Sequence, residues 1–140
     1  MFEKTNDTLI SLGLLVLRVG AAAMLICSHG WPKLAHFATR AESFSDPLHV
    51  GRPLSLGLVL FAEVLCSALV FIGLATRAAL VPILIFFGVA IFVQNGAAPF
   101  AQKELALIYA LPFLALMIMG PGRYSVDGSG SGGGGSRSRR

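Results

Sequence analysis

Residues 78–93 read AALVPILIFFGVAIFV, a run without a single charged side chain. A helix that crosses the hydrocarbon core of a bilayer needs about 20 mainly apolar residues, and flanking residues extend this run to 78–95. Three further runs, at 9–28, 54–74 and 104–120, are also long and mainly apolar, although each contains one charged residue. The sequence therefore predicts an all-α integral membrane protein, a four-helix bundle.

The composition excludes the soluble classes of protein. Of the 140 residues, 55% are hydrophobic and 13% are charged, whereas an ordinary soluble domain has about 25% charged residues. Three of the eleven basic residues lie in a Gly/Ser/Arg tail at 128–140, which resembles a flexible linker added to an expressed protein. Without that tail the charges nearly balance, so we expect no nucleic-acid partner. Residues 1–127 are expected to form a single domain.

The connections between the runs predict the topology. The turn Ala75–Arg77 is so short that the second and third helices must be antiparallel neighbours. We expect an up-down antiparallel bundle with both termini on one side of the membrane. A long loop, His29–Arg52, joins the first two helices, and its middle (33–44, KLAHFATRAESF) has the apolar spacing of a short amphipathic helix on the membrane surface.

Two charged residues, Arg18 and Glu63, fall in the interior of the predicted spans, whereas Glu104 lies at the edge of the last one. A charge at the centre of a bilayer costs about 3 kcal/mol, so it persists only when it is paired or lines a polar cavity. Counted from helix ends near Gly30 and Pro53, the two side chains differ in depth by about 3 Å. We therefore expect an Arg18–Glu63 ion pair, which either locks the two helices together or forms the floor of a polar pocket.

Further polar residues converge at the membrane face toward which this pocket would open. The expected ligand-binding set is Arg18, Glu63, Lys33, Glu104, His29 and Asn95, and Trp31, Gln94, Gln102 and Lys103 lie at the same face. Most of these side chains are equally typical of interfacial anchoring, because Trp, Lys and His are common at the level of the lipid headgroups. Glu104 could likewise serve the N-terminal dipole of the last helix.

Metal and disulfide chemistry find little support. Cys27 and Cys66 are separated by about 15 Å along the bundle axis, too far for a disulfide. The three histidines are spaced by seven and thirteen residues, and Gly30 and Pro32 oppose a continuous helix that would bring His29 and His36 onto one face. We expect no metal site, no haem ligation and no nucleotide loop.

Several motifs in a fixed order resemble the DoxX family of small bacterial membrane proteins. They are LRVGAA at 17–22, HGWPKL at 29–34, FAEVL at 61–65, FIGLATRAA at 71–79, KELAL at 103–107 and GPGRYSVD at 120–127. The resemblance spans Leu9–Asp127. It implies four transmembrane helices in the bacterial inner membrane with cytoplasmic termini.

The same resemblance implies a redox context. The family is named after a subunit linked to a quinol oxidase or thiosulfate:quinone oxidoreductase, and some members are membrane partners of redox complexes. Arg18, Lys33, Glu63 and Glu104 occupy the polar positions of the family, and Gly120–Asp127 its C-terminal signature. The polar loop around Arg40–His49 is longer than usual.

Two hypotheses of function follow. In the first, the chain is a component of a quinone-linked oxidoreductase and holds a quinone ring near the Arg–Glu pair. In the second, it is a non-enzymatic assembly or scaffold subunit whose ion pair is structural. Its long loop and its lipid-facing third helix, which carries Phe86, Phe87 and Phe92, would then bind a partner. The expected partners are the lipid bilayer, a redox protein and a further copy of the chain.

Overall fold

The computed structural model describes residues 2–130, and within these residues it contains helices but no strands. Four continuous helical stretches are long and apolar enough to cross a membrane: Glu3–Ala35, Arg52–Ile72, Thr76–Gln94 and Phe100–Met119. The predicted all-helical class and the presence of four helices apolar enough to span a membrane are therefore confirmed, although the first helical stretch is much longer than 9–28.

The first long helix does not end where the sequence predicted. α1 (Phe2–Leu25) continues through a π-helical segment, η1 (Ile26–Gly30), into α2 (Trp31–Ala35). Pro32 lies in the first turn of α2, where its missing N–H is tolerated. Gly30 lies directly against the second helix, because a Cβ there would be 2.7 Å from the Val64 side chain. The expected break at Gly30 and Pro32 is wrong.

The second and third long helices are also interrupted by π-helical segments. α4 (Arg52–Leu60), η2 (Phe61–Cys66) and α5 (Ser67–Ile72) form the second, and α6 (Thr76–Gly88) with η3 (Val89–Gln94) form the third. Between them Gly73 (φ +77°) and Ala75 (φ +46°) have left-handed conformations that reverse the chain in three residues. Such π segments are frequent at functional sites.

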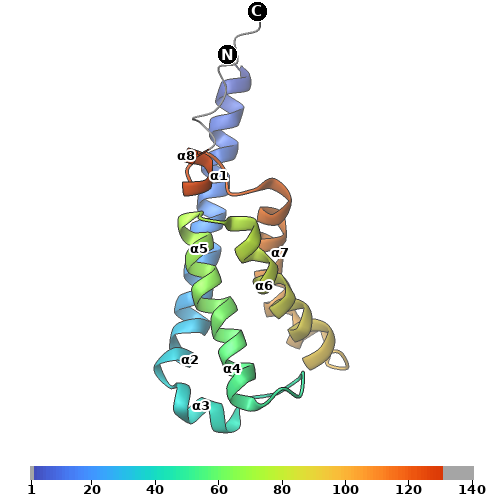
Figure 1. The fold of residues 1–140 in the computed structure, drawn as a ribbon. Coiled ribbons are helices and arrows are strands. Elements are labelled where there is room, and N and C mark those ends of the chain that lie inside the picture. The colour runs from blue at the N-terminus through green and yellow to red at the C-terminus, as the bar shows by residue number, and fades with distance from the viewer. Residues whose placement is uncertain (1, 131–140) are drawn as a thin grey trace, which may run out of the picture.

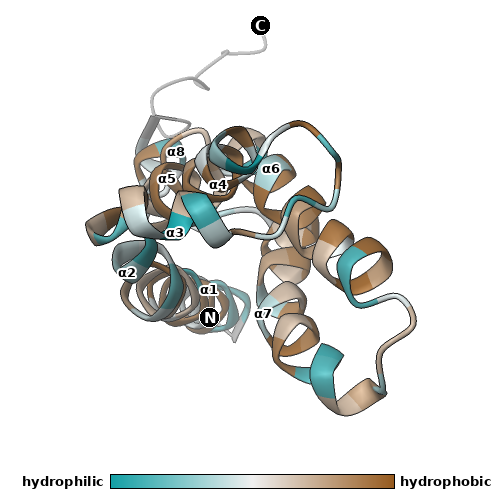
Figure 2. Ribbon diagram, turned by 90° about the horizontal axis from the view of Figure 1, so that it is seen from below, coloured by the Kyte–Doolittle hydropathy of each residue, from teal (hydrophilic) through white to brown (hydrophobic). Residues whose placement is uncertain are grey.

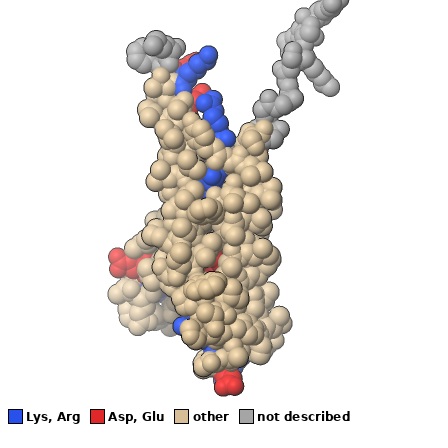
Figure 3. All heavy atoms as spheres, turned by 90° about the vertical axis from the view of Figure 1, so that its left-hand side faces the viewer, with Lys and Arg blue, Asp and Glu red and all other residues tan. Residues whose placement is uncertain are grey.

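The fourth long helix is α7 (Phe100–Met119), which packs against α1 and α6. α5 packs against α1 and α6, so the four stretches surround one core, which includes Leu25, Ile83 and Phe113. Figure 1 shows α3 (Phe37–Ser43) and the start of α4 at one end of the bundle and α8 (Val126–Gly130) at the other. Figure 2, seen from the α3 end, shows apolar residues on the outward faces of the helices as well. Most of the face in Figure 3 carries no charged side chain.

The segment between the first two long helices is largely ordered by its own contacts. It contains α3 (Phe37–Ser43), which agrees with the short helix predicted there. Asp46 accepts hydrogen bonds from the Ser55 hydroxyl and from the backbone N–H groups of Val50 and Gly51. The Ser55 hydroxyl, with these amides, lowers the pKa of Asp46. Asp46 thus fixes the loop to the first turn of α4.

The described residues end in a short helix, α8 (Val126–Gly130). Residues 128–130, which the sequence assigned to the flexible tail, therefore belong to this helix, and the Gly128 N–H donates to the Ser125 hydroxyl. The remainder of the predicted tail, 131–140, lies outside the described residues.

Candidate functional site

Glu63 forms an ion pair with Lys33 in the interior of the bundle. The Lys33 ammonium donates to both carboxylate oxygens of Glu63, each at 2.7 Å. The Glu63 side chain is 1% exposed and that of Lys33 is 16% exposed. α2 supplies the lysine and η2 the glutamate.

The predicted Arg18–Glu63 pair is wrong. Arg18 is 2% exposed, but its guanidinium donates to the backbone carbonyls of Pro121 at 3.1 Å and Tyr124 at 2.8 Å. It therefore binds the segment after α7, at the opposite end of the bundle from Lys33. Its Nε has no hydrogen-bond partner among the described residues.

The error comes from the axial register of the first two helices. Gly30 lies beside the backbone of Glu63, whereas Arg18 lies beside Gly73, where an added Cβ would be 2.6 Å from the guanidinium. Ten to twelve residues of helix separate these two levels, which corresponds to about 15–18 Å. Because the first helix continues to Ala35, depths counted from Gly30 placed Arg18 too close to Glu63.

The Lys33–Glu63 pair lines a cavity of about 180 Å³. His29, from η1, lines it one helical turn before Lys33, and α7 contributes Gln102, Ala106 and Tyr109. Gln102 is exposed, so the cavity opens to the outside near the start of α7. All four long helices thus contribute residues to the lining of this cavity, the second of them through η2.

Aromatic rings form the apolar walls of the same cavity. Phe86 and Phe87 lie on α6, with ring centroids 5.0 Å apart. Phe87 stacks nearly parallel to Tyr109 at 6.1 Å, and His29 meets Tyr109 edge-on at 5.2 Å. The Lys33 ammonium is 5.9 Å from the centre of the Phe86 ring. A charged pair therefore faces a space bounded by aromatic rings.

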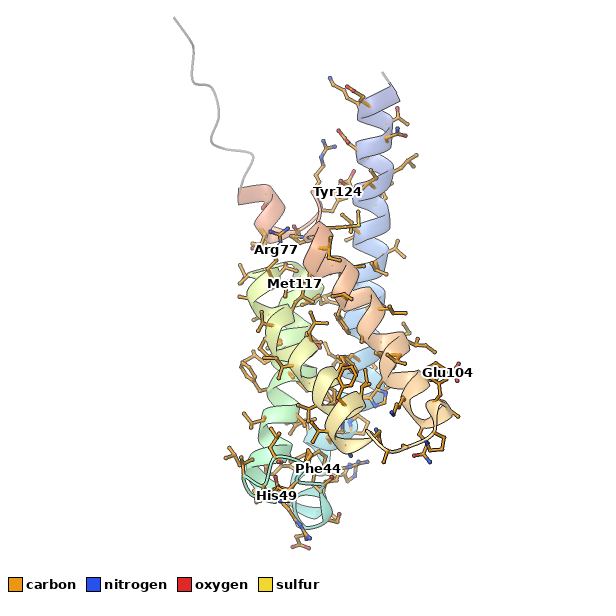
Figure 4. The ribbon with its side chains drawn as sticks, turned by 90° about the vertical axis from the view of Figure 1, so that its right-hand side faces the viewer. Phe44, His49, Arg77, Glu104, Met117 and Tyr124 are labelled. Carbon is orange, nitrogen blue, oxygen red and sulfur yellow. The ribbon has the colours of Figure 1, made fainter. Side chains whose placement is uncertain are left out.

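A second, larger cavity of about 390 Å³ adjoins the first. Lys33, Phe86 and Ala90 line both cavities, so these three residues form the wall between them. The rest of the larger cavity is mainly apolar and lies between the second and third long helices, above the loop that carries Phe44 (Figure 4).

The predicted ligand-binding residues divide into three groups. Lys33, Glu63 and His29 come together in the smaller cavity, Arg18 lies at the other end, and Asn95 and Glu104 line neither cavity. Glu104 is exposed and points away from the bundle in Figure 4. Of the additional polar residues, Gln102 lines the smaller cavity, Gln94 lines the larger one, and Lys103 donates to the Gly96 carbonyl. Whether any of them binds a ligand stays a prediction.

The aromatic residues of the site were not among the predicted ligand-binding residues. Phe86 and Phe87 were expected to face lipid or a partner protein, and Tyr109 was not singled out. A signal was present, because Gln102, Ala106 and Tyr109 follow each other at intervals of four and three residues. That spacing places them on one face of a helix, and the polar Gln102 marks which face is lined by a cavity.

The C-terminal signature closes the opposite end of the bundle. Asp127 accepts hydrogen bonds from the N–H groups of Ala75 at 2.8 Å and Thr76 at 2.9 Å, and its own N–H donates to the Gly73 carbonyl. Its carboxylate thus caps the exposed N–H groups at the start of α6. Together with the two carbonyls that bind Arg18, these contacts join residues 120–127 to α1 and to the α5–α6 turn.

We expect the Asp127 cap to be visible as a pH dependence of stability. The hydrogen bond from the Thr76 amide is the main reason why the pKa of Asp127 lies below its usual value of about 3.9, and the bond from the Ala75 amide lowers it further. The stabilisation is therefore complete above pH about 4 and is lost as pH falls through the lower pKa of the folded state. Both carboxylate oxygens accept an N–H, and Asp127→Asn replaces one of them with an NH2 group that cannot accept, so it should cost about 1 kcal/mol near neutral pH.

Thermal unfolding of purified wild type and Asp127→Asn at several pH values measures this. The difference between the two melting temperatures should shrink as the pH approaches 3. Asp7→Asn, at an exposed position of α1, is the matched control and should not change the melting temperature. A difference that stays constant down to low pH would mean that the Asp127 carboxylate is not held by these amides.

Metal-ligating and thiol groups are scattered in the part of the chain that the structure describes. No three His, Cys, Asp or Glu side chains are grouped there so as to hold a metal ion. Cys27 is exposed, Cys66 is buried, and both are free thiols. The polar groups that line the smaller cavity are an amine, a carboxylate, an imidazole, a phenol and an amide.

A sequence model of the DoxX family matches residues 13–96. The match includes His29, Lys33 and Glu63 and ends before α7. No curated protein and no solved structure matches the chain significantly.

Proposed function

This chain belongs to the DoxX family, and we propose that it is a bacterial inner-membrane protein that binds a quinone ring in the cavity beside Lys33 and Glu63. In this proposal it acts as the membrane subunit of a quinone-linked redox complex. The observation that carries the proposal is a buried ion pair facing a ring-sized space with aromatic walls.

The four long helices are proposed to cross the membrane in alternating directions, with both termini in the cytoplasm and residues 1–127 as one domain. Their lengths support this, since each has at least 19 residues and about 20 suffice to cross the hydrocarbon core. The engagement of Asp127 with the start of α6 supports a single unit that includes the C-terminal signature.

The size of the cavity suits one six-membered ring. A cavity of about 150 Å³ in an engineered soluble protein binds benzene, and the cavity here has about 180 Å³. Phe86, Phe87 and Tyr109 offer faces and edges against which a ring can pack. Two fused rings with large substituents would exceed this space.

The polar groups of the cavity suit the two carbonyl oxygens of a quinone. The Lys33 ammonium is a donor with three hydrogens, and the Tyr109 hydroxyl and the Gln102 amide are further donors on the α7 side. Lys33 and α7 lie on different sides of the cavity. Donors on two sides can orient a ring whose carbonyls point in opposite directions.

Proton transfer is the chemistry proposed for the ion pair. Reduction of a quinone to a quinol consumes two electrons and two protons, and oxidation releases them. In the ion pair the proton lies on the Lys33 ammonium, so Lys33 is the group that gives a proton to the ligand. The neutral amine then takes up a proton from solvent at the open side of the cavity, and the Glu63 carboxylate stabilises the ammonium that forms again. Two such cycles supply the two protons of the reduction. The electrons are assigned to an associated redox protein, which the chain would dock in the membrane.

Binding of a tail-free benzoquinone to the purified chain in nanodiscs tests the proposal. We expect saturable binding by calorimetry and a matching rise in melting temperature. Ala106→Phe fills the cavity and Glu63→Gln removes the carboxylate, and each should weaken binding at least tenfold, about 1.4 kcal/mol.

Ala101→Phe, at an exposed position on the same helix, is the matched control and should bind as the wild type does. A folded wild type that shows no saturable binding would overturn the proposal. So would binding that Ala106→Phe leaves unchanged.

The assembly hypothesis retains one specific observation in its favour. α7 is the least buried of the four long helices: 11% of its apolar stretch is buried inside the bundle, against 28–44% for the other three. Ile108, Leu111 and Ile118 lie exposed along it. As a scaffold, the chain would use this face for a redox protein or a further copy of itself, and complex formation would then survive Ala106→Phe.

A further inference from the structure

We propose that the larger cavity holds the apolar tail of the ligand whose ring lies in the smaller one, so that the chain binds a quinone with a long hydrocarbon tail. This inference rests on the proposed function. It names the class of ligand, which the ring site alone leaves open between tail-free and tailed quinones.

The two cavities share a wall that contains one small residue, Ala90. Lys33, Phe86 and Ala90 line both spaces, and of these three Ala90 has only a methyl side chain. Ala90 is therefore the position at which a substituent on a ring in the smaller cavity can reach the larger one. Since Lys33 and Phe86 line the same wall, they would contact the ring near the point where its tail begins.

The lining of the larger cavity suits a hydrocarbon chain. Its volume of about 390 Å³ is roughly twice that of the smaller cavity. Val59, Pro82, Ile85 and Val89 are among its apolar lining residues. The charged group at its border is Lys33, which is bound to Glu63.

An acyl chain of the bilayer is the competing occupant, because its chemistry matches that of an apolar tail. Such a chain would fill the larger cavity without regard to the ring site. A tailed ring is favoured by the contact between the two cavities, because occupation of both spaces requires a polar ring and an apolar tail in one molecule.

Photo-crosslinking distinguishes these occupants. The probe is a benzoquinone whose alkyl tail carries a diazirine, and the comparison probe is an alkyl alcohol with the same diazirine but no ring. We expect the quinone probe to label residues of the larger cavity in nanodiscs, and an excess of unlabelled tailed quinone to abolish that labelling. The ring-free probe should instead label exposed residues all round the bundle.

Val59→Phe narrows the larger cavity alone and should abolish the labelling there, while a tail-free benzoquinone binds as before. Val81→Phe adds the same bulk at an exposed position of α6 that lines neither cavity, and should label as the wild type does.

Labelling of the larger cavity by both probes alike would overturn the inference, as would labelling that Val59→Phe leaves unchanged. In either case the binding of the tail-free ring would still stand. Failure of the tail-free benzoquinone to bind the wild type would overturn the proposed function itself.

Discussion

Lys33→Met is expected to destabilise the folded chain by about 3–5 kcal/mol, the cost of removing one partner from a buried ion pair. The substitution leaves the Glu63 carboxylate, which is 1% exposed, without the ammonium that contacts both its oxygens. Methionine keeps most of the side-chain volume, so the loss would reflect charge and hydrogen bonding. Chemical or thermal unfolding in nanodiscs measures it.

The double variant Lys33→Met/Glu63→Met is the decisive companion. Replacing a buried ion pair by apolar residues of similar size is often neutral or stabilising. We therefore expect the double variant to regain most of the lost stability while it fails to bind a quinone ring. If the double variant remains as unstable as Lys33→Met, the instability does not come from an unpaired carboxylate.

Arg18→Met is expected to cost about 3 kcal/mol and to release the C-terminal segment. The guanidinium donates to the Pro121 and Tyr124 carbonyls from a site that is 2% exposed, and a hydrogen bond that involves a charged group contributes about 1.5–3 kcal/mol. Hydrogen exchange should speed up over residues 121–127, and the melting temperature should fall.

Arg123→Met is the matched control, because Arg123 belongs to the same segment but is exposed. It should leave both measurements near their wild-type values. Quinone binding should survive Arg18→Met in protein that remains folded, since Arg18 does not line the cavity. A variant that keeps its protected C-terminal segment but loses the ligand would place Arg18 at the site after all.

The spans were predictable because hydrophobic length is a local property. Runs such as 78–93 contain more consecutive apolar residues than a helix of a soluble protein can bury, whatever elements pack against it. The helix ends were less predictable: Gly30 and Pro32 signalled a break, but the π-helical turn and the close approach to Val64 let the first helix continue. Tertiary packing therefore outweighed the local tendency of Gly30 and Pro32 to end a helix.

The ion pair was only half predictable. Burial of Glu63 and its need for a cationic partner followed from its place in an apolar run, but the identity of the partner depended on axial register. The prediction placed Gly30 level with Pro53, whereas Gly30 lies beside Glu63, and this offset of about ten residues exchanged Lys33 for Arg18. The aromatic walls at Phe86, Phe87 and Tyr109 needed the packing of α6 on α7, which no single helix encodes.

The most direct test of the account is a pair of double-mutant cycles in nanodiscs, one between Lys33 and Glu63 and one between Arg18 and Glu63. We expect a coupling free energy above about 1 kcal/mol for Lys33 with Glu63, as for residues in direct contact, and additive effects for Arg18 with Glu63. Strong coupling of Glu63 to Arg18 together with additivity toward Lys33 would contradict the site described above.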